Sequence, residues 1–247
     1  MMATFGLYFS LIFTLFYYEC SLVTIIGFYY FKDVNLVLFD LDDTLLSGDT
    51  EGEWVQFMLD NGMIQDDSFL DKMSVFTADY RKGVLNIFDY SNFLLKPLRG
   101  YKVLDIKDKV EEFSTEVVNK LSDKTTESLL NSHSADQCVI TSGTLSFLVK
   151  QISNELGVDH CFGTDPENIE GFYTGKVFGH PNFSEEKVRR IKEWIEGKFY
   201  EKVYAYSDSI HDLALLEFSD FATAVNPDNQ LMEEAKQRNW RIDISRL

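Results

Sequence analysis

The chain has 247 residues, of which 45% are hydrophobic and 26% charged, and this is the composition of a globular protein with a full core. It carries 40 Asp and Glu residues against 23 Lys and Arg residues, a net charge of -17. So acidic a chain is repelled by nucleic acid and by anionic membrane surfaces, so we expect neither as a partner, and an anionic substrate would need local cations or a metal.

The N-terminal segment, residues 1–31, is almost wholly apolar and long enough for a transmembrane helix. No Lys or Arg precedes it and no small-residue cleavage site is apparent, which disfavours a signal peptide. If residues 4–31 anchor the chain, Lys32 favours a cytoplasmic location for the rest of the protein. Alternatively, the protein begins at Val34 and residues 1–33 are a mis-assigned start, because almost no linker precedes the first predicted strand. Either alternative predicts a cytoplasmic domain, and both stay open.

Short apolar runs rich in β-branched and aromatic residues predict buried parallel strands. These runs cover residues 36–40, 138–141, 203–206 and 221–225, with a weaker one at 241–244. Helical patterns cover residues 144–156, 184–197 and 211–218. Alternating strands and helices predict an α/β fold with a doubly wound, mainly parallel sheet.

Residues 51–132 interrupt this alternation with several amphipathic helices and no strand pattern of comparable strength. We therefore predict a helical cap inserted into an α/β core that consists of residues 34–50 and 133–247. Residues 168–179 predict a β-hairpin whose turn lies near Thr174 and Gly175.

Carboxylates gather where two predicted strands end. Asp40 and Asp42 follow the first strand, and Asp208 and Asp212 follow residues 203–206. Ligands of open α/β sheets bind at the carboxyl ends of the strands. Converging carboxylates repel one another, and Mg2+ prefers a few carboxylates together with waters and a phosphate. The pattern therefore predicts a metal site that also holds phosphate.

Phosphate also requires donors and a cation. Ser142 and Gly143 stand where a strand is predicted to become a helix, and a helix N-terminus binds anions. Lys187 is about the third residue of a helix for which Ser184 is a plausible N-cap. A cation there opposes the helix dipole at a cost of about 0.3–1 kcal/mol, which points mildly to function. Lys187 could instead be a surface lysine, with Lys176 as the alternative phosphate ligand.

The segments "DLDDT", "ITSGT" and "SDSIHD", with Lys187 between the last two, have the order and spacing of the four motifs of haloacid dehalogenase-like hydrolases. The further segments "GDTEGEW", "FGTDPENIEGFYTGKV" and "AVNPDNQL" are similar to its subfamily IB, which includes phosphoserine phosphatase-like and histidinol-phosphatase-like enzymes. The resemblance covers about residues 35–245. Two departures are Ser207, where the family usually has Gly, and Asp43, which we interpret as a solvated loop residue.

The resemblance implies a role for each motif residue. Asp40 would attack phosphorus and become an aspartyl phosphate, and Asp42 would act as general acid and base. Ser142 and Lys187 would bind the phosphoryl oxygens, and Thr44 would orient the turn. The implied Mg2+ ligands are the carboxylates of Asp40 and Asp208 and the backbone carbonyl of Asp42, with Asp212 bound indirectly.

Specificity is expected to lie in the cap. Glu53, Tyr80, Arg81 and Arg99 could meet the rest of the substrate, with Gly143 beside them, although each could equally be a solvated loop residue. Tyr80 and Arg81 are preferred, because "DYRKG" falls between two predicted cap helices. His211 is interpreted as an exposed helix residue.

The predicted function is Mg2+-dependent hydrolysis of a small phosphorylated metabolite such as histidinol phosphate or phosphoserine. A phosphotransferase would share every motif, and only competition by an acceptor alcohol would separate the two. The third alternative is a membrane-tethered binding protein without turnover.

Overall fold

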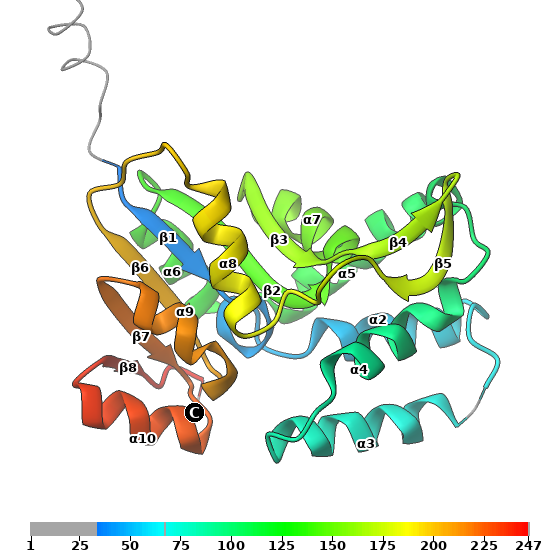
Figure 1. Cartoon of the computed structure of the whole chain (residues 1–247), viewed down its shortest axis with the longest axis horizontal. Coiled ribbons are helices and arrows are strands. Elements are labelled where there is room, and N and C mark those ends of the chain that lie inside the picture. Colours follow the sequence, from blue (N-terminus) through cyan, green and yellow to red (C-terminus); the bar gives the residue numbers. More distant parts are fainter. Residues whose placement is uncertain (1–33, 67, 247) are drawn as a thin grey trace, which may run out of the picture. The chain divides into compact units, whose positions relative to one another are not determined.

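The computed structural model describes residues 34–66 and 68–246 (Figure 1). Both alternatives for residues 1–33 concern a segment that lies outside the described residues. Within the described part of the chain, no helix is both long and apolar enough to cross a membrane.

One six-stranded sheet lies at the centre of Asn35–Leu247, in the order β3-β2-β1-β6-β7-β8, and every neighbouring pair is parallel. The strands are β1 (Leu36–Phe39), β2 (Gln137–Leu145), β3 (His160–Thr164), β6 (Val203–Ser207), β7 (Phe221–Val225) and β8 (Arg241–Asp243). The doubly wound α/β prediction is confirmed, and all five predicted strands are present. The edge strand β3 was missed.

Helices cover both faces of the sheet, because successive side chains of β1 point to opposite sides. Val37 and Phe39 pack in one buried cluster with α5 and α7, and Leu36 and Leu38 pack in another with α8, α9 and α10. Figure 1 shows α8 and α9 in front of the sheet, and α5 and α7 behind it. The bounds are α5 (Lys107–Leu121), α7 (Ser146–Glu155), α8 (Glu185–Trp194), α9 (Leu213–Phe218) and α10 (Asn229–Arg238).

The segment between β1 and β2 is helical, as predicted. It contains α2 (Thr50–Asp60), α3 (Phe69–Arg81), α4 (Ile87–Leu95), α5 and α6 (Lys124–Ser132). Helix α5 packs along α7 against the sheet, whereas α3 and α4 line a cavity beside Asp40. The helical segment is therefore not one separate layer, and the cap boundaries at residues 51 and 132 stay a prediction.

The predicted hairpin exists, but its turn lies elsewhere. Strands β4 (Pro166–Ile169) and β5 (Phe172–Val177) are joined at Glu170 and Gly171, which have φ of 53° and 83°. The predicted turn at Thr174 and Gly175 is therefore wrong. Gly175 lies inside β5 with φ of 81°, and a Cβ there would come within 3.0 Å of the Arg99 Cβ. A glycine is required here by the positive φ and by the close approach of Arg99, and not by a turn.

Candidate active site

Strand pairing brings the motif residues to one edge of the sheet. Phe39 of β1 lies opposite Ile140 of β2 and Tyr206 of β6, so the residues that come after these strands meet. A cavity of about 350 Å3 opens there. The predicted site residues that line it are Asp40, Asp42, Tyr80, Arg81, Ser142, Gly143, Lys187, Asp208 and Asp212.

Asp42 lies on an irregular turn after β1 and is held at both carboxylate oxygens. Oδ1 accepts a hydrogen bond from the Thr50 backbone N–H at 2.6 Å, and Oδ2 accepts one from the Thr144 hydroxyl at 2.7 Å. Burial, with the nearby Asp49 carboxylate, raises the pKa of Asp42. A carboxyl that retains its proton more readily than usual is suited to donating it to a leaving group. Thr144 was missed in the sequence, although it belongs to the same "ITSGT" segment.

Lys187 is buried, with 3% of its surface exposed, so the surface alternative is wrong. Its ammonium lies 2.7 Å from Asp40 Oδ1 and 2.8 Å from the Asp212 carboxylate. Burial alone would lower the pKa of Lys187, but the Asp212 and Asp40 carboxylates outweigh it and raise this pKa. Lys187 is the third residue of α8, as predicted, whereas the alternative Lys176 is exposed on β5.

Asp40 and Asp208 lie close enough to reach one hydroxyl. Thr44 Oγ1 lies 3.2 Å from Asp40 Oδ2 and 3.0 Å from Asp208 Oδ1, and it accepts a hydrogen bond from the Asp208 backbone N–H. Thr44 thus links the end of β1 to the end of β6. Burial raises the pKa of Asp40 to about 7 despite the Lys187 ammonium, and burial with the Asp40 charge raises the pKa of Asp208.

These two carboxylates fit a divalent cation. They are hard oxygen donors close together, and their raised pKa values reflect burial and mutual repulsion that a bound cation would relieve. No group of three or more His, Cys, Asp or Glu side chains is arranged to hold a metal in residues 34–66 and 68–246. The backbone carbonyl of Asp42 as a further ligand stays a prediction.

Ser207, which stands where the resembling family usually has Gly, contributes its hydroxyl to the site. Ser207 Oγ donates a hydrogen bond to Asp212 at 2.8 Å and accepts one from the Ser209 backbone N–H at 3.2 Å. Asp212 therefore holds Lys187 and Ser207 together. Its predicted indirect role at a metal stays a prediction.

Ser142 was predicted to lie at the start of a helix, and this prediction is wrong. Strand β2 continues to Leu145 and α7 begins at Ser146, because Leu145 still pairs with Thr164 of β3 after a register shift that follows Thr141. Ser142 Oγ accepts a hydrogen bond from the Thr144 backbone N–H at 3.1 Å and lies 3.4 Å from Asp42 Oδ2. Ser184 stands at the N-cap position of α8, but its side chain makes no capping hydrogen bond.

The aromatic side chain of Tyr80 joins α3 to the loop after β6. Its hydroxyl lies 2.7 Å from Ser209 Oγ, and its ring lies 4.4 Å from the His211 ring. His211 Nε2 lies 3.2 Å from the Tyr80 carbonyl oxygen. The prediction of an exposed His211 is wrong, because the cap covers this part of the loop.

Glu53 does not line the cavity, and neither does Arg99, which is exposed. Glu53 pairs with Lys120 at 2.6 Å instead. Residues two apart on a helix point about 200° apart, so Glu51 faces the cavity where Glu53 cannot. Glu51 accepts a hydrogen bond from the Tyr90 hydroxyl at 2.9 Å, and burial raises its pKa to about 8.

Replacing Glu51 by Gln is expected to flatten the pH dependence of stability. The pKa of Glu51 is raised in the folded chain from 4.5 to about 8, so its contribution is present below pH 4.5 and is lost as pH rises towards 8. In EDTA, the free energy of unfolding of the wild type should fall by about 2–4 kcal/mol more than that of E51Q across this window. Urea titrations at both ends measure it, with E53Q as the control; parallel curves for E51Q and the wild type would contradict the assignment.

Arg246 holds the turn after β1 that carries Asp42 and Asp43. Its guanidinium donates hydrogen bonds to the backbone carbonyls of Asp43 at 2.7 Å and Leu45 at 3.3 Å, and Nε lies 2.7 Å from Asp123. Asp43 has φ of 52°, a left-handed conformation that such contacts help to maintain. Arg246 therefore fixes the turn that carries Asp42.

Replacing Arg246 by Ala is expected to lower kcat about tenfold with little change in KM, since one or two charge-assisted hydrogen bonds of about 1.5–3 kcal/mol each support the turn. Steady-state kinetics with Mg2+ measures this. R246K should restore part of kcat, and R238A is the matched control because Arg238 pairs with Glu217 and Glu234 and lies over the Trp240 ring, away from the turn. An unchanged kcat in a folded R246A protein would exclude the positioning role.

The sheet, the strand-end carboxylates and the buried lysine beside one cavity are those of a phosphatase enzyme. The model of the family described as haloacid dehalogenase-like hydrolase matches residues 37–217. The chain belongs to this family, and the resemblance found in its motifs is confirmed.

Individual proteins agree with this assignment. The chain is 32% identical over 216 residues to a histidinol-phosphatase from Neisseria meningitidis serogroup C (strain 8013), covering 84% of this chain and 97% of that protein. A solved structure of a protein of unknown function from Bordetella pertussis Tohama I is 31% identical with a TM-score of 0.78, covering 86% of this chain and 99% of that one. The structure of a phospho-aspartyl intermediate analogue of phosphoserine phosphatase has a TM-score of 0.61, with 18% identity and coverage of 87% and 95%. This last likeness concerns the fold alone.

Proposed function

We propose that the chain hydrolyses a small phosphomonoester whose alcohol carries an amine, of the histidinol phosphate type, through an aspartyl phosphate on Asp40. One observation carries the proposal: Asp40 faces the cavity beside Asp42, and its Oδ1 accepts a hydrogen bond from the buried Lys187 ammonium. A nucleophile, an acid and a fixed cation in one cavity are the components that phosphoryl transfer requires.

In the first step, a carboxylate oxygen of Asp40 forms a bond to phosphorus as the bond from phosphorus to the alcohol oxygen breaks. Asp42 gives its proton to that oxygen, so the alcohol leaves neutral. In the second step, Asp42 takes a proton from a water whose oxygen attacks phosphorus. Inorganic phosphate leaves and the Asp40 carboxylate is restored.

The phosphoryl oxygens would be bound by Lys187 and Ser142, beside the Gly143 backbone. Asp40, Asp208 and the Asp42 carbonyl would hold Mg2+. Mg2+ supplies positive charge that favours the ionised carboxylates and neutralises the transferring phosphoryl group. Asp212 would keep Lys187 in place during both steps.

The acidic side of the cavity supports a cationic alcohol. Asp49 and Glu51 line it at the end of α2, and their carboxyls could accept hydrogen bonds from an ammonium or imidazolium group. The apolar side chains of Phe76, Leu85 and Ile87 also line the cavity and suit a ring or a short alkyl chain. The similarity to the meningococcal histidinol-phosphatase points the same way.

Phosphoserine is the second candidate, and Arg81 favours it. Arg81 lines the cavity and forms no ion pair with residues 34–66 or 68–246, so its guanidinium is available to a substrate carboxylate. Histidinol phosphate has no carboxylate, so Arg81 discriminates between the two candidates.

The test is phosphate release from histidinol phosphate, phosphoserine and a sugar phosphate, with Mg2+ or with EDTA. We expect Mg2+-dependent release, fastest with histidinol phosphate, and none with D40N. Added acceptor alcohols that divert phosphate would reveal the phosphotransferase alternative. A folded wild type that releases no phosphate from any of the three would refute this substrate class.

A further inference from the structure

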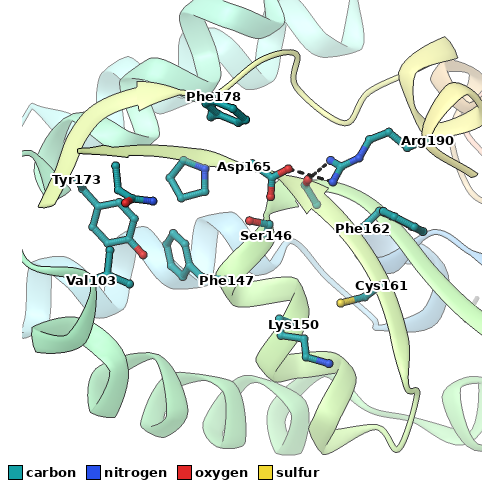
Figure 2. Close-up of a pocket in the computed structure, with 13 residues that line it drawn as sticks. Val103, Ser146, Phe147, Lys150, Cys161, Phe162, Asp165, Tyr173, Phe178 and Arg190 are labelled. Carbon is teal, nitrogen blue, oxygen red and sulfur yellow. Dashed lines mark hydrogen bonds and ion pairs between the residues drawn. The ribbon is translucent and has the colours of Figure 1, made fainter. Parts of the chain in front are cut away.

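A second cavity, of about 650 Å3, lies on the side of the sheet where β3 forms the edge (Figure 2). It is open to solvent and is lined by residues of α7, β3, the β4–β5 hairpin and α8, and it shares no lining residue with the catalytic cavity. We propose that it binds a small aromatic carboxylate. Its volume falls within the range of about 300–1,000 Å3 typical of small-molecule sites.

One end of this cavity is aromatic. Figure 2 shows the rings of Phe147, Tyr173 and Phe178 around this end, and Pro166 also lines the cavity. The Phe147 and Tyr173 ring centroids are 5.9 Å apart, and Phe178 is 67% exposed although it is a large apolar side chain. A flat ring placed here would find aromatic partners in edge and offset arrangements and would cover Phe178.

The same end contains a hydroxyl without a protein partner. Tyr173 is only 4% exposed, and its hydroxyl lies toward Phe147 at the cavity (Figure 2). Within the described parts of the chain, this hydroxyl forms no hydrogen bond. Burial raises the pKa of Tyr173, which keeps its proton available for donation. The hydroxyl is not among the fully buried polar atoms that lack a partner, so it is accessible from the cavity and can donate to a ligand there.

The remaining polar groups favour an anion. Arg190 is already engaged: it donates to the Gly163 carbonyl at 2.6 Å and pairs with Asp165 at 2.9 Å. Lys150 lines the cavity and has no ion pair or hydrogen bond among residues 34–66 and 68–246, nor has the Ser146 hydroxyl. The cavity therefore offers a hydroxyl, a neutralised pair and, on α7, the unpaired ammonium of the exposed Lys150 (Figure 2). In a chain of net charge -17, such a local excess of positive charge suits one carboxylate.

The experiment is isothermal titration calorimetry of the full chain with indole-3-carboxylate and benzoate. Benzamide lacks the charge, and butyrate lacks the ring. We expect the two aromatic carboxylates to bind at least about tenfold more tightly than either analogue. Y173F keeps the aromatic ring but lacks the hydroxyl, and K150Q keeps most of the side-chain length but lacks the charge. Each variant should weaken binding about three- to tenfold by removing one donor. K192Q is the matched control on α8, and it should bind as the wild type does.

Two further arms distinguish this cavity from the catalytic one, which also contains aromatic rings and Arg81. Binding should persist in R81Q and in saturating inorganic phosphate. Loss of binding in either arm, or unchanged binding in both Y173F and K150Q, would overturn the proposal, as would the absence of binding by either aromatic carboxylate. The measurement involves no turnover, so its outcome is independent of the proposed hydrolase activity.

Discussion

Replacing Asp40 by Asn should reduce phosphate release at least about 10^4-fold, the scale on which loss of a covalent nucleophile acts. The amide keeps the size of the side chain but cannot form the aspartyl phosphate, and it also weakens the contact with Lys187. Stopped assays with the best substrate of the panel, in Mg2+, measure the effect. Circular dichroism and urea unfolding establish that the variant is folded.

The matched control for D40N is D43N, three residues along the same turn. Asp43 lies at the cavity with φ of 52°, a conformation that Asn adopts readily, and the mechanism gives its carboxylate no step. We expect D43N to retain activity within about threefold of the wild type. Equal losses in D40N and D43N would show that the turn, and not the nucleophile, had been disrupted.

Replacing Lys187 by Met is the second large change, and it should affect both turnover and stability. The apolar side chain fills similar space but leaves Asp40 and Asp212 buried without their shared cation. Loss of transition-state charge stabilisation should lower kcat about 10^2–10^3-fold. The uncompensated carboxylates should lower the free energy of unfolding by about 3–5 kcal/mol in EDTA near neutral pH.

The stability loss in K187M should shrink as the pH is lowered. Burial raises the pKa of Asp40 to about 7 even with Lys187 present, so this carboxyl becomes neutral in mildly acidic solution and no longer needs a cation. Urea titrations at several pH values measure this trend. K192M is the control, because Lys192 is an exposed lysine on the same helix. A loss that stays constant with pH would mean that packing, and not charge, accounts for the effect.

The local pattern of apolar residues was sufficient to predict most strands of the sheet. The strands β1, β2, β6 and β7 are buried by helices on one or both faces, so their sequences are apolar runs that can be recognised without tertiary information. Strand β3, with the sequence "HCFGT", was missed because three of its five residues are only half-buried at the sheet edge. Its register also depends on Gly163, where a Cβ would come within 2.6 Å of the Thr144 carbonyl oxygen.

Of the helical residues that line the cavity, some were likewise predicted from the sequence and others were missed. Tyr80 and Arg81 were predicted to lie on a loop between two helices; both line the cavity, but they are the last two residues of α3. Glu51 was missed in favour of Glu53, because the phase of α2 depends on where the helix begins. The Asp49 side chain caps α2 and thereby sets which carboxylate faces inward.

The sequence by itself determined the α/β class, the helical insertion and the carboxylates of Asp40, Asp42 and Asp208, because apolar periodicity and strand-end motifs are local. Only the tertiary structure decided that Lys187 lies between Asp40 and Asp212, that Glu51 and Tyr90 share a hydrogen bond, and that Arg246 holds the turn after β1. These contacts join residues that are 25 to 203 positions apart in the chain. Their formation depends on packing and burial, which no short segment of the sequence encodes.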